Sequence, residues 1–123
     1  MACEVEYTDE FEKWWVGLSE PEQISIAAVV DVLAVKDTRL GFPYSSGIEG
    51  SRFGHMRELR IQHAGDPYRV FYAFDPRRAA ILLIGGCKAG DDRFYERMVP
   101  WADRIYEAHL QQLENESTSS REK

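Results

Sequence analysis

The sequence predicts a single α+β domain in which an N-terminal helix hairpin packs on a small, twisted, mainly antiparallel sheet of about four strands. A C-terminal helix completes the arrangement. Three observations support it: two helix-like segments precede residue 40, three strand-like segments lie between residues 56 and 85, and one long amphipathic segment follows. With 123 residues and 44% hydrophobic content, the chain is long enough to bury a core as one domain.

A short strand and a first helix are predicted near the N-terminus. Residues 4–7 alternate polar and apolar side chains, as a half-buried strand does, and Thr8 or Asp9 then offers a side chain that can cap a helix. Four apolar residues follow at the helical spacing i, i+3, i+4 and i+7, namely Phe11, Trp14, Trp15 and Leu18. This stripe predicts packing against the core.

A second helix is predicted from about Glu20 to Val35. Ser19 and Glu22 have the spacing of a capping box, and Pro21 lies in the first turn, where its missing N–H costs nothing. The expected core positions are Ile24, Ala27, Ala28, Val30 and Leu33. Because few residues separate the two helices, they should form an antiparallel hairpin.

The middle of the chain predicts a loop followed by a meander of strands. Residues 36–54 are rich in glycine and serine, so they should form a long irregular connection. Strands are then expected at residues 56–62, 68–74 and 79–85. The separators contain Gly-Asp-Pro and Asp-Pro, which favour tight turns, and successive strands should therefore pair antiparallel.

The last third predicts one helix and a tail. The helix should run from about Arg93 to Leu113, and Pro100 should bend it or mark its effective start. Residues 114–123 contain no apolar side chain, so we expect a disordered tail there. The predicted division is one domain at residues 1–113 and a tail at 114–123.

Several protein classes are disfavoured by composition. No apolar run approaches the roughly 20 residues of a membrane-spanning helix, and the N-terminus lacks the pattern of a secretory signal. We therefore expect a cytoplasmic protein that does not contact membranes. Cys3 and Cys87 are expected to be reduced thiols, with Cys87 in the core. No cluster has the spacing of metal ligands, so neither a metal nor a cofactor is predicted.

Charge is distributed unevenly along the chain. The net charge of −6 is a poor match for a nucleic-acid binder, because contacts to phosphate need Lys or Arg. Both ends are acidic, however, whereas residues 41–88 carry seven bases against four acids. The bases are Arg52, Arg57, Arg60, Arg69, Arg77, Arg78 and Lys88. A basic face is therefore possible in the middle of the chain.

Two neighbouring strands carry charged side chains within the predicted sheet. Alternation in the first meander strand puts Glu58 and Arg60 on one face and Leu59 with its apolar neighbour on the other. In the next strand Arg69 shares a face with Phe71 and Ala73, so its guanidinium needs an anion or a partner carboxylate. The pattern leaves two interpretations open: a cross-strand ion-pair network or an anion-binding site.

Three stretches resemble the RelE/HigB superfamily of toxins. They are Met56-Arg57-Glu58-Leu59-Arg60, then Tyr68-Arg69-Val70-Phe71-Tyr72-Ala73-Phe74-Asp75-Pro76, and then Lys88-Ala89-Gly90-Asp91-Asp92-Arg93-Phe94-Tyr95. The resemblance covers about residues 4–113, and the order of helix hairpin, meander and final helix matches as well. It implies a RelE-like microbial ribonuclease fold and the toxin of a type II toxin–antitoxin system, similar to HigB.

The resemblance also implies roles for individual residues. Arg60 and Arg69 would bind the scissile phosphate or stabilise the transition state. Lys88 and Tyr95 match the late basic residue and the late aromatic residue of the superfamily. Glu58 stands where many relatives carry a basic residue, and some relatives use a carboxylate elsewhere as general base, so its role is the least defined of the five. Contacts to the RNA backbone would come from Arg57, Arg77, Arg78 and Arg93.

By the same resemblance, the activity would be metal-independent, ribosome-associated endoribonuclease cleavage of mRNA, which inhibits translation. Attack by the ribose 2′-hydroxyl would leave a 2′,3′-cyclic phosphate and a 5′-hydroxyl. The partners would be the ribosome, mRNA and a cognate antitoxin in a hetero-oligomer, with an acidic antitoxin segment facing the arginines. Two alternatives stay open: a ParE-like gyrase inhibitor, and an inactive phage-derived binding module of the same fold.

The three histidines are not predicted to act in the site. His55 and His63 lie at opposite ends of the first meander strand, so they are expected to be loop residues rather than an acid–base pair. His109 is expected on the exposed side of the last helix.

Overall fold

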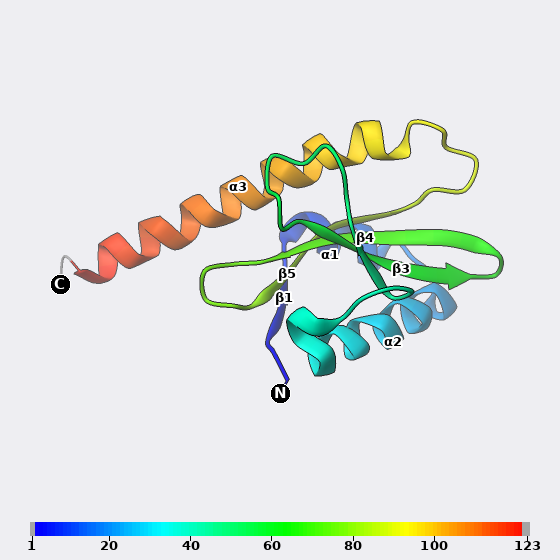
Figure 1. Ribbon diagram of the computed structural model, residues 1–123, viewed down its shortest axis with the longest axis horizontal. Coiled ribbons are helices and arrows are strands. Elements are labelled where there is room, and N and C mark those ends of the chain that lie inside the picture. Colours follow the sequence, from blue (N-terminus) through cyan, green and yellow to red (C-terminus); the bar gives the residue numbers. More distant parts are fainter. Residues whose placement is uncertain (1, 122–123) are drawn as a thin grey trace.

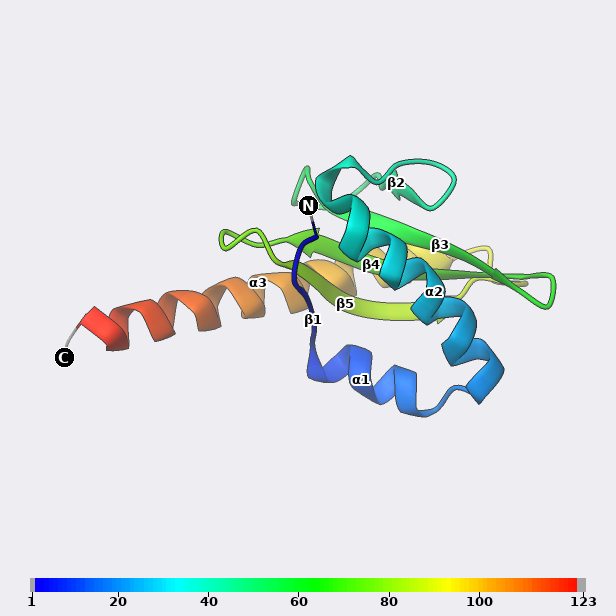
Figure 2. The same cartoon turned by 90° about the horizontal axis from the view of Figure 1, so that it is seen from below.

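The computed structural model describes residues 2–121, with helices on both faces of one sheet (Figures 1 and 2). In chain order the elements are β1 (Val5–Tyr7), α1 (Asp9–Val16), α2 (Glu20–Lys36), a 3-10 helix (Asp37–Arg39), β2 (Ser45–Gly47), β3 (Arg57–His63), β4 (Asp66–Phe74), β5 (Ala80–Cys87) and α3 (Phe94–Arg121). The predicted α+β class and order of elements are confirmed.

The sheet has five strands in the order β1-β5-β4-β3-β2. β1 pairs parallel with β5, and all other neighbours pair antiparallel, so the mainly antiparallel prediction is confirmed. The fifth strand, β2, lies inside the segment expected to be an irregular loop. Its residues, Ser-Ser-Gly, carry no apolar alternation. Pairing with β3 and a 2.7 Å hydrogen bond between the hydroxyls of Ser45 and Tyr72 hold it in place.

The helix hairpin covers one face of the sheet, where α1 packs on β5 and α2 on β3 (Figure 2). The capping predictions are confirmed: the Thr8 hydroxyl accepts from the Phe11 N–H, and Ser19 and Glu22 form the capping box. The inner face of α2 differs from the prediction, however. Ile26 and Leu33 are fully buried, whereas Ile24 is 62% exposed and Ala28 is also exposed. Apolar residues surround most of this helix, so their spacing does not define a face.

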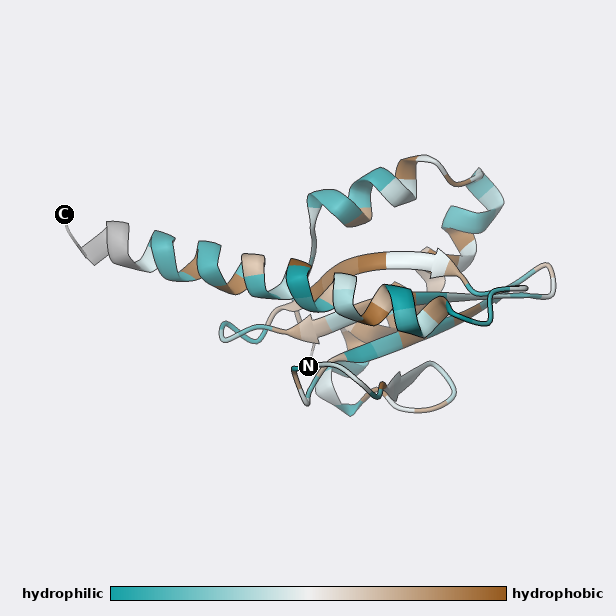
Figure 3. Ribbon diagram, turned by 90° about the horizontal axis from the view of Figure 1, so that it is seen from above, coloured by the Kyte–Doolittle hydropathy of each residue, from teal (hydrophilic) through white to brown (hydrophobic). Residues whose placement is uncertain are grey.

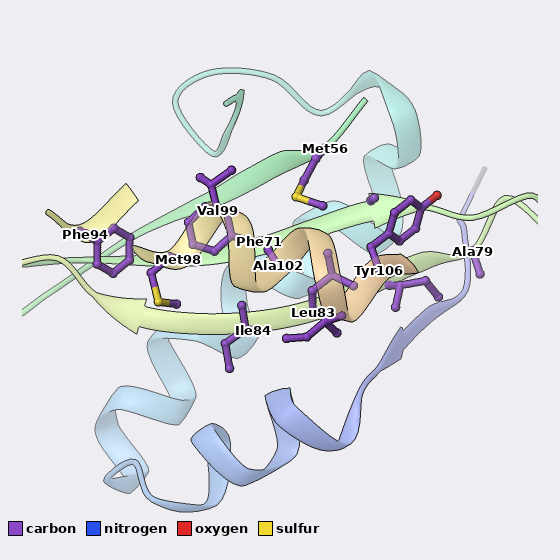
Figure 4. Close-up of a cluster of buried hydrophobic side chains, with 13 residues drawn as sticks. Met56, Phe71, Ala79, Leu83, Ile84, Phe94, Met98, Val99, Ala102 and Tyr106 are labelled. Carbon is purple, nitrogen blue, oxygen red and sulfur yellow. The ribbon is translucent and has the colours of Figure 1, made fainter. Parts of the chain in front are cut away.

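The opposite face of the sheet is covered by α3 (Figures 1 and 3). Its buried side chains pack with Phe71, Leu83 and other residues of the central strands (Figure 4). The helix extends to Arg121, so the predicted end near Leu113 is wrong. Pro100 lies inside the helix and does not mark its start. Residues 122–123 of the predicted tail lie outside the described residues.

Two glycines let helices approach β5 closely from both sides. A Cβ atom on Gly85 would lie 2.2 Å from the Trp14 ring, and one on Gly86 would lie 3.0 Å from Phe94. Trp14 belongs to α1 and Phe94 to α3, so these positions fix the spacing of both helix layers.

Cys87, the last residue of β5, is exposed, so the prediction that it lies in the core is wrong. Among residues 2–121, no helix combines the length and apolar character needed to cross a bilayer.

Candidate functional site

The fold gathers four of the five predicted catalytic residues around one of them, Glu58, on the α3 side of the sheet. Glu58 and Arg60 share a face of β3, and Arg60 lies opposite Arg69 on β4. The first turn of α3 places Tyr95 beside them. We call Glu58, Arg60, Arg69 and Tyr95 the Glu58 cluster. Lys88, the fifth predicted residue, adjoins it, because its Nζ lies 5.1 Å from the centre of the Tyr95 ring.

Glu58 is the hub of the cluster, with a side chain that is only 5% exposed. Its Oε1 accepts a 2.7 Å hydrogen bond from the Tyr95 hydroxyl. Its Oε2 accepts from the Ser46 hydroxyl at 2.8 Å and from Arg60 Nη1 at 3.2 Å. The carboxylate is therefore satisfied on both oxygens, as a buried charge requires.

Arg69 is also buried, with 5% of its side chain exposed. Its Nε lies 3.6 Å from Glu58 Oε1 and 3.4 Å from the Tyr95 hydroxyl, and its Nη1 donates to the Tyr68 carbonyl at 3.0 Å. The strand pattern left two interpretations open, and these contacts are those of the ion-pair network. Arg69 and Glu58 therefore form the buried part of the cluster.

The members that reach the surface are Arg60, Tyr95 and the adjoining Lys88. Arg60 is 31% exposed, and both Tyr95 and Lys88 are partly exposed. Burial raises the pKa of Tyr95, and its hydrogen bond to Glu58 raises it further, against a lowering effect of Arg69. The phenol is therefore protonated at neutral pH and can act as a hydrogen-bond donor.

The four predicted RNA-backbone residues are not brought together. Arg57 lies on the opposite face of β3, where its Nε donates to the Ser45 hydroxyl at 3.0 Å. Arg77 and Arg78 lie in the β4–β5 turn, beyond the C-terminal end of β4, and Arg77 already pairs with Asp75. Arg93 is exposed, one residue before α3. Along the chain Arg57 adjoins Glu58 and Arg93 stands two residues before Tyr95, but the Arg57 side chain is turned to the other face of the sheet.

The histidines have partners outside the Glu58 cluster. His63 Nδ1 lies 2.8 Å from the Ser25 hydroxyl, and His55 Nε2 lies 2.9 Å from the Tyr106 hydroxyl. His63 is the last residue of β3 rather than a loop residue. His109 is not the surface residue predicted, since it is 16% exposed and lies 2.9 Å from a carboxylate oxygen of Asp75.

Sequence reasoning missed two residues beside the cluster. Ser46 belongs to β2, which the Ser-Ser-Gly composition did not reveal, and Phe42 lies in the loop before it. The only signal that would have found Ser46 is the register of a strand that was not expected.

In residues 2–121, no three or more His, Cys, Asp or Glu side chains are grouped so that they could hold a metal ion.

Comparison with known proteins places the chain in a family. Residues 13–107 match the family described as "Phage derived protein Gp49-like (DUF891)". HigB3 and HigB2 of Mycobacterium tuberculosis, both named as putative toxins, are similar in sequence. HigB3 is 38% identical over 102 residues, which span 82% of this chain and 88% of HigB3. HigB2 is 33% identical over 117 residues, which span 94% of this chain but only 58% of HigB2.

Solved structures share the fold at low sequence identity. A mutant of the E. coli toxin RelE in the free state has a TM-score of 0.58 at 11% identity, covering 80% of this chain and 96% of RelE. The RelE–RelB complex of Pyrococcus horikoshii has a TM-score of 0.53 at 19% identity, covering 73% of this chain and 99% of the matched chain. The fold is therefore RelE-like. By its family match and its HigB relatives, the chain belongs to the Gp49-like family within the RelE/HigB superfamily.

Proposed function

We propose that this protein is the toxin of a type II toxin–antitoxin system and cleaves mRNA on the ribosome without a metal. The Glu58 cluster carries the proposal, because it joins a buried carboxylate and a phenol to partly exposed cationic side chains on one face of the sheet. The HigB relatives support the role as a toxin. Ribosomes and mRNA are cytoplasmic, so the toxin would act in the cytoplasm.

The cluster suits attack by a ribose 2′-hydroxyl on the adjacent phosphate. The 2′-oxygen bonds to phosphorus and passes its proton to the Tyr95 oxygen, while the phenol proton moves to Glu58. The bond to the 5′-oxygen breaks, and Lys88 protonates the leaving group. The products are a 2′,3′-cyclic phosphate and a 5′-hydroxyl.

Cations on the rim balance the charge that develops on the phosphate. The Arg60 guanidinium is exposed enough to bind a non-bridging oxygen, whereas the buried Arg69 holds Glu58 and the Tyr95 hydroxyl in position. Arg78 and Arg93 are exposed and remain candidates for contacts to the RNA backbone. Arg57 and Arg77 already have partners within the protein, which argues against that role for them.

The same geometry explains the expected antitoxin. Arg60 and Lys88 flank the site on the surface, so an acidic segment of an antitoxin would both cover the cluster and complement its charge. The resulting hetero-oligomer would prevent mRNA from entering.

Induced expression with and without a candidate antitoxin tests the proposal. We expect growth arrest without the antitoxin, and primer extension on cellular transcripts should show new 5′ ends in the coding region. Glu58→Gln and Tyr95→Phe should abolish the new ends, whereas Lys36→Ala, an exposed position on α2, should leave them unchanged. Normal growth with intact transcripts at high expression would contradict the proposal.

A second candidate function follows from how completely Glu58 is satisfied by its neighbours. A carboxylate with partners on both oxygens suits an inactive binding module of the same fold as well as a catalyst. Growth arrest with intact transcripts would favour a binding activity. A gyrase supercoiling assay would then separate a ParE-like inhibitor from other binding modules.

Independence from metal ions is a separate prediction. The proposed chemistry uses only protein side chains and the substrate's own 2′-hydroxyl, so cleavage should survive EDTA. The measurement uses a ribosome-free transcript at high protein concentration, because ribosomes themselves need Mg²⁺. A strict requirement for an added divalent ion on that substrate would contradict the prediction.

A further inference from the structure

Phe42 is an exposed aromatic side chain in contact with the Glu58 cluster. It is 77% exposed, more than any other large apolar side chain among the described residues. An exposed phenylalanine alone carries no functional meaning, because isolated apolar residues are common on protein surfaces. Phe42 differs in that the Arg60 guanidinium carbon lies 5.3 Å from the centre of its ring. The exposed ring is therefore tied to a proposed phosphate-binding residue.

The loop that presents Phe42 is anchored on both sides. Leu40 before it and Ser45 after it are buried, and the Ser45 N–H donates to the Gly41 carbonyl at 3.0 Å. The Arg60 N–H donates to the Tyr44 carbonyl at 2.8 Å, which holds the loop alongside β3. The ring is consequently displayed from a fixed backbone rather than from a free loop.

We propose that Phe42 and Arg60 form a stacking platform for an unpaired nucleobase of single-stranded RNA next to the scissile phosphate. An aromatic ring and the planar guanidinium both offer flat faces on which bases stack. Arg60 also bonds to Glu58, so a base on the platform would lie beside the catalytic carboxylate. Stacking tolerates any base, so this platform grips RNA without selecting its sequence. The inference rests on the proposed function, because it names how that site holds its substrate.

Binding of a non-cleavable RNA tests the platform. The probe is a fluorescent single-stranded oligonucleotide with 2′-O-methyl groups, which lacks the nucleophile, and fluorescence anisotropy at low salt gives its Kd. Phe42→Ala should weaken binding about 5- to 150-fold, as expected for loss of one stacked base. Phe42→Trp should restore it. Tyr7→Ala is the matched control, because Tyr7 is a 60% exposed aromatic on β1, at the opposite edge of the sheet.

Photo-crosslinking separates a stacking contact from an indirect effect on the loop. The same oligonucleotide carrying 5-iodouridine should crosslink to Phe42 or to its loop neighbours, and mass spectrometry of the peptides identifies the site. If Phe42→Ala binds as tightly as the wild type and the crosslinks fall elsewhere, the platform is refuted, whether or not the protein cleaves mRNA. If binding depends on Phe42 but no cleavage occurs on ribosomes, the platform stands and the catalytic proposal fails. Absence of both RNA binding and cleavage in the wild type overturns both.

Discussion

At the scale of single residues, the site depends on how the charge of Glu58 is balanced. A carboxylate that is 5% exposed loses most of its hydration, and several kcal/mol of that cost must be recovered locally. Tyr95, Ser46 and Arg60 donate hydrogen bonds to it, and Arg69 adds a second positive charge at 3.6 Å. Arg69 thus pairs with the Glu58 carboxylate, which is one of the two interpretations that strand alternation alone left open.

Arg69→Ala should affect both stability and cleavage. Removing one partner of a buried ion pair typically costs about 3–5 kcal/mol, and Arg60 would offset only part of that loss here. Cleavage should fall about a hundredfold or more, because Glu58 and the Tyr95 hydroxyl lose the group that positions them. Urea unfolding and cleavage of a programmed ribosome complex measure the two effects.

A double variant keeps this prediction decisive if Arg69→Ala unfolds. Glu58→Gln together with Arg69→Ala removes both charges, so much of the lost stability should return while cleavage stays absent. If Arg69→Ala keeps the wild-type melting temperature and the wild-type rate, the assignment of Arg69 to the site is wrong.

At the scale of elements, the start of α2 is fixed to the sheet by one carboxylate. Glu22 accepts from the Ser19 N–H at 2.7 Å as part of the capping box, and it also accepts from the Tyr68 hydroxyl of β4. The Tyr68 hydrogen bond is the main reason that the pKa of Glu22 falls to about 2, and the Ser19 N–H lowers it further. The capping contact to Ser19 could be predicted from the sequence, whereas the tertiary contact to Tyr68 could not.

This contact predicts how stability changes in acid. Because the folded pKa of Glu22 is about 2 against an ordinary value of 4.5, its contribution is complete above pH 4.5 and is lost as the pH falls towards 2. Glu22→Gln should therefore flatten the pH dependence of unfolding in that window. Glu20→Gln, an exposed position in the same turn, serves as the control. Equal slopes for wild type and Glu22→Gln would show that the contact contributes nothing.

Elements with a strong local pattern were predictable from the sequence, and those held by distant partners were not. Thr8 and Ser19 identified both helix starts. The β3–β4 turn was placed correctly at Ala64 and Gly65, but Asp66 and Pro67, expected in the turn, pair with His63 and Gln62 as the first residues of β4. β2 forms because β3 offers a free edge with which it pairs. The residues of β2 themselves show no strand pattern in the sequence. The candidate site follows the same division: strand alternation paired Glu58 with Arg60, but only the tertiary fold adds Ser46.

Truncation after Leu113 should leave folding and cleavage nearly unchanged. Although α3 extends to Arg121, residues 114–117 are exposed, so removing them breaks little packing. The melting temperature of the truncated chain should stay within a few degrees of the wild-type value. A larger drop would show that the end of α3 packs on the domain and that the predicted boundary at residue 113 is misplaced.

At the scale of the whole molecule, α3 is fastened to the sheet by polar groups beyond its apolar core. The Tyr106 hydroxyl donates to the Phe74 carbonyl, and Asp103 accepts from the Ser51 hydroxyl and the Arg52 N–H. Asp75, with a fully buried side chain, lies 2.9 Å from His109 of α3. Tyr95 is carried by the other end of the same helix, so one element links the candidate site to a distant polar cluster.

Asp75→Ala tests whether that distant cluster stabilises the molecule without taking part in the chemistry. Burial alone would raise the pKa of Asp75, but hydrogen bonds from His109, Arg77 and two backbone N–H groups outweigh it and lower the pKa. Folding therefore favours the ionised carboxylate. Its contribution to stability is present above the ordinary pKa of 3.8 and is lost as the pH falls below that value.

Asp75→Ala removes this buried acceptor, which should cost about 3 kcal/mol of stability at neutral pH and increase hydrogen exchange around His109. Cleavage well below the melting temperature should persist, because Asp75 lies beyond the C-terminal end of β4, where its ion-pair partners are Arg77 and His109 rather than members of the Glu58 cluster. Asp31→Ala, an exposed position on α2, provides the control for both measurements. A folded Asp75→Ala protein that no longer cleaves RNA would instead show that the position of Tyr95 depends on the attachment of the whole helix.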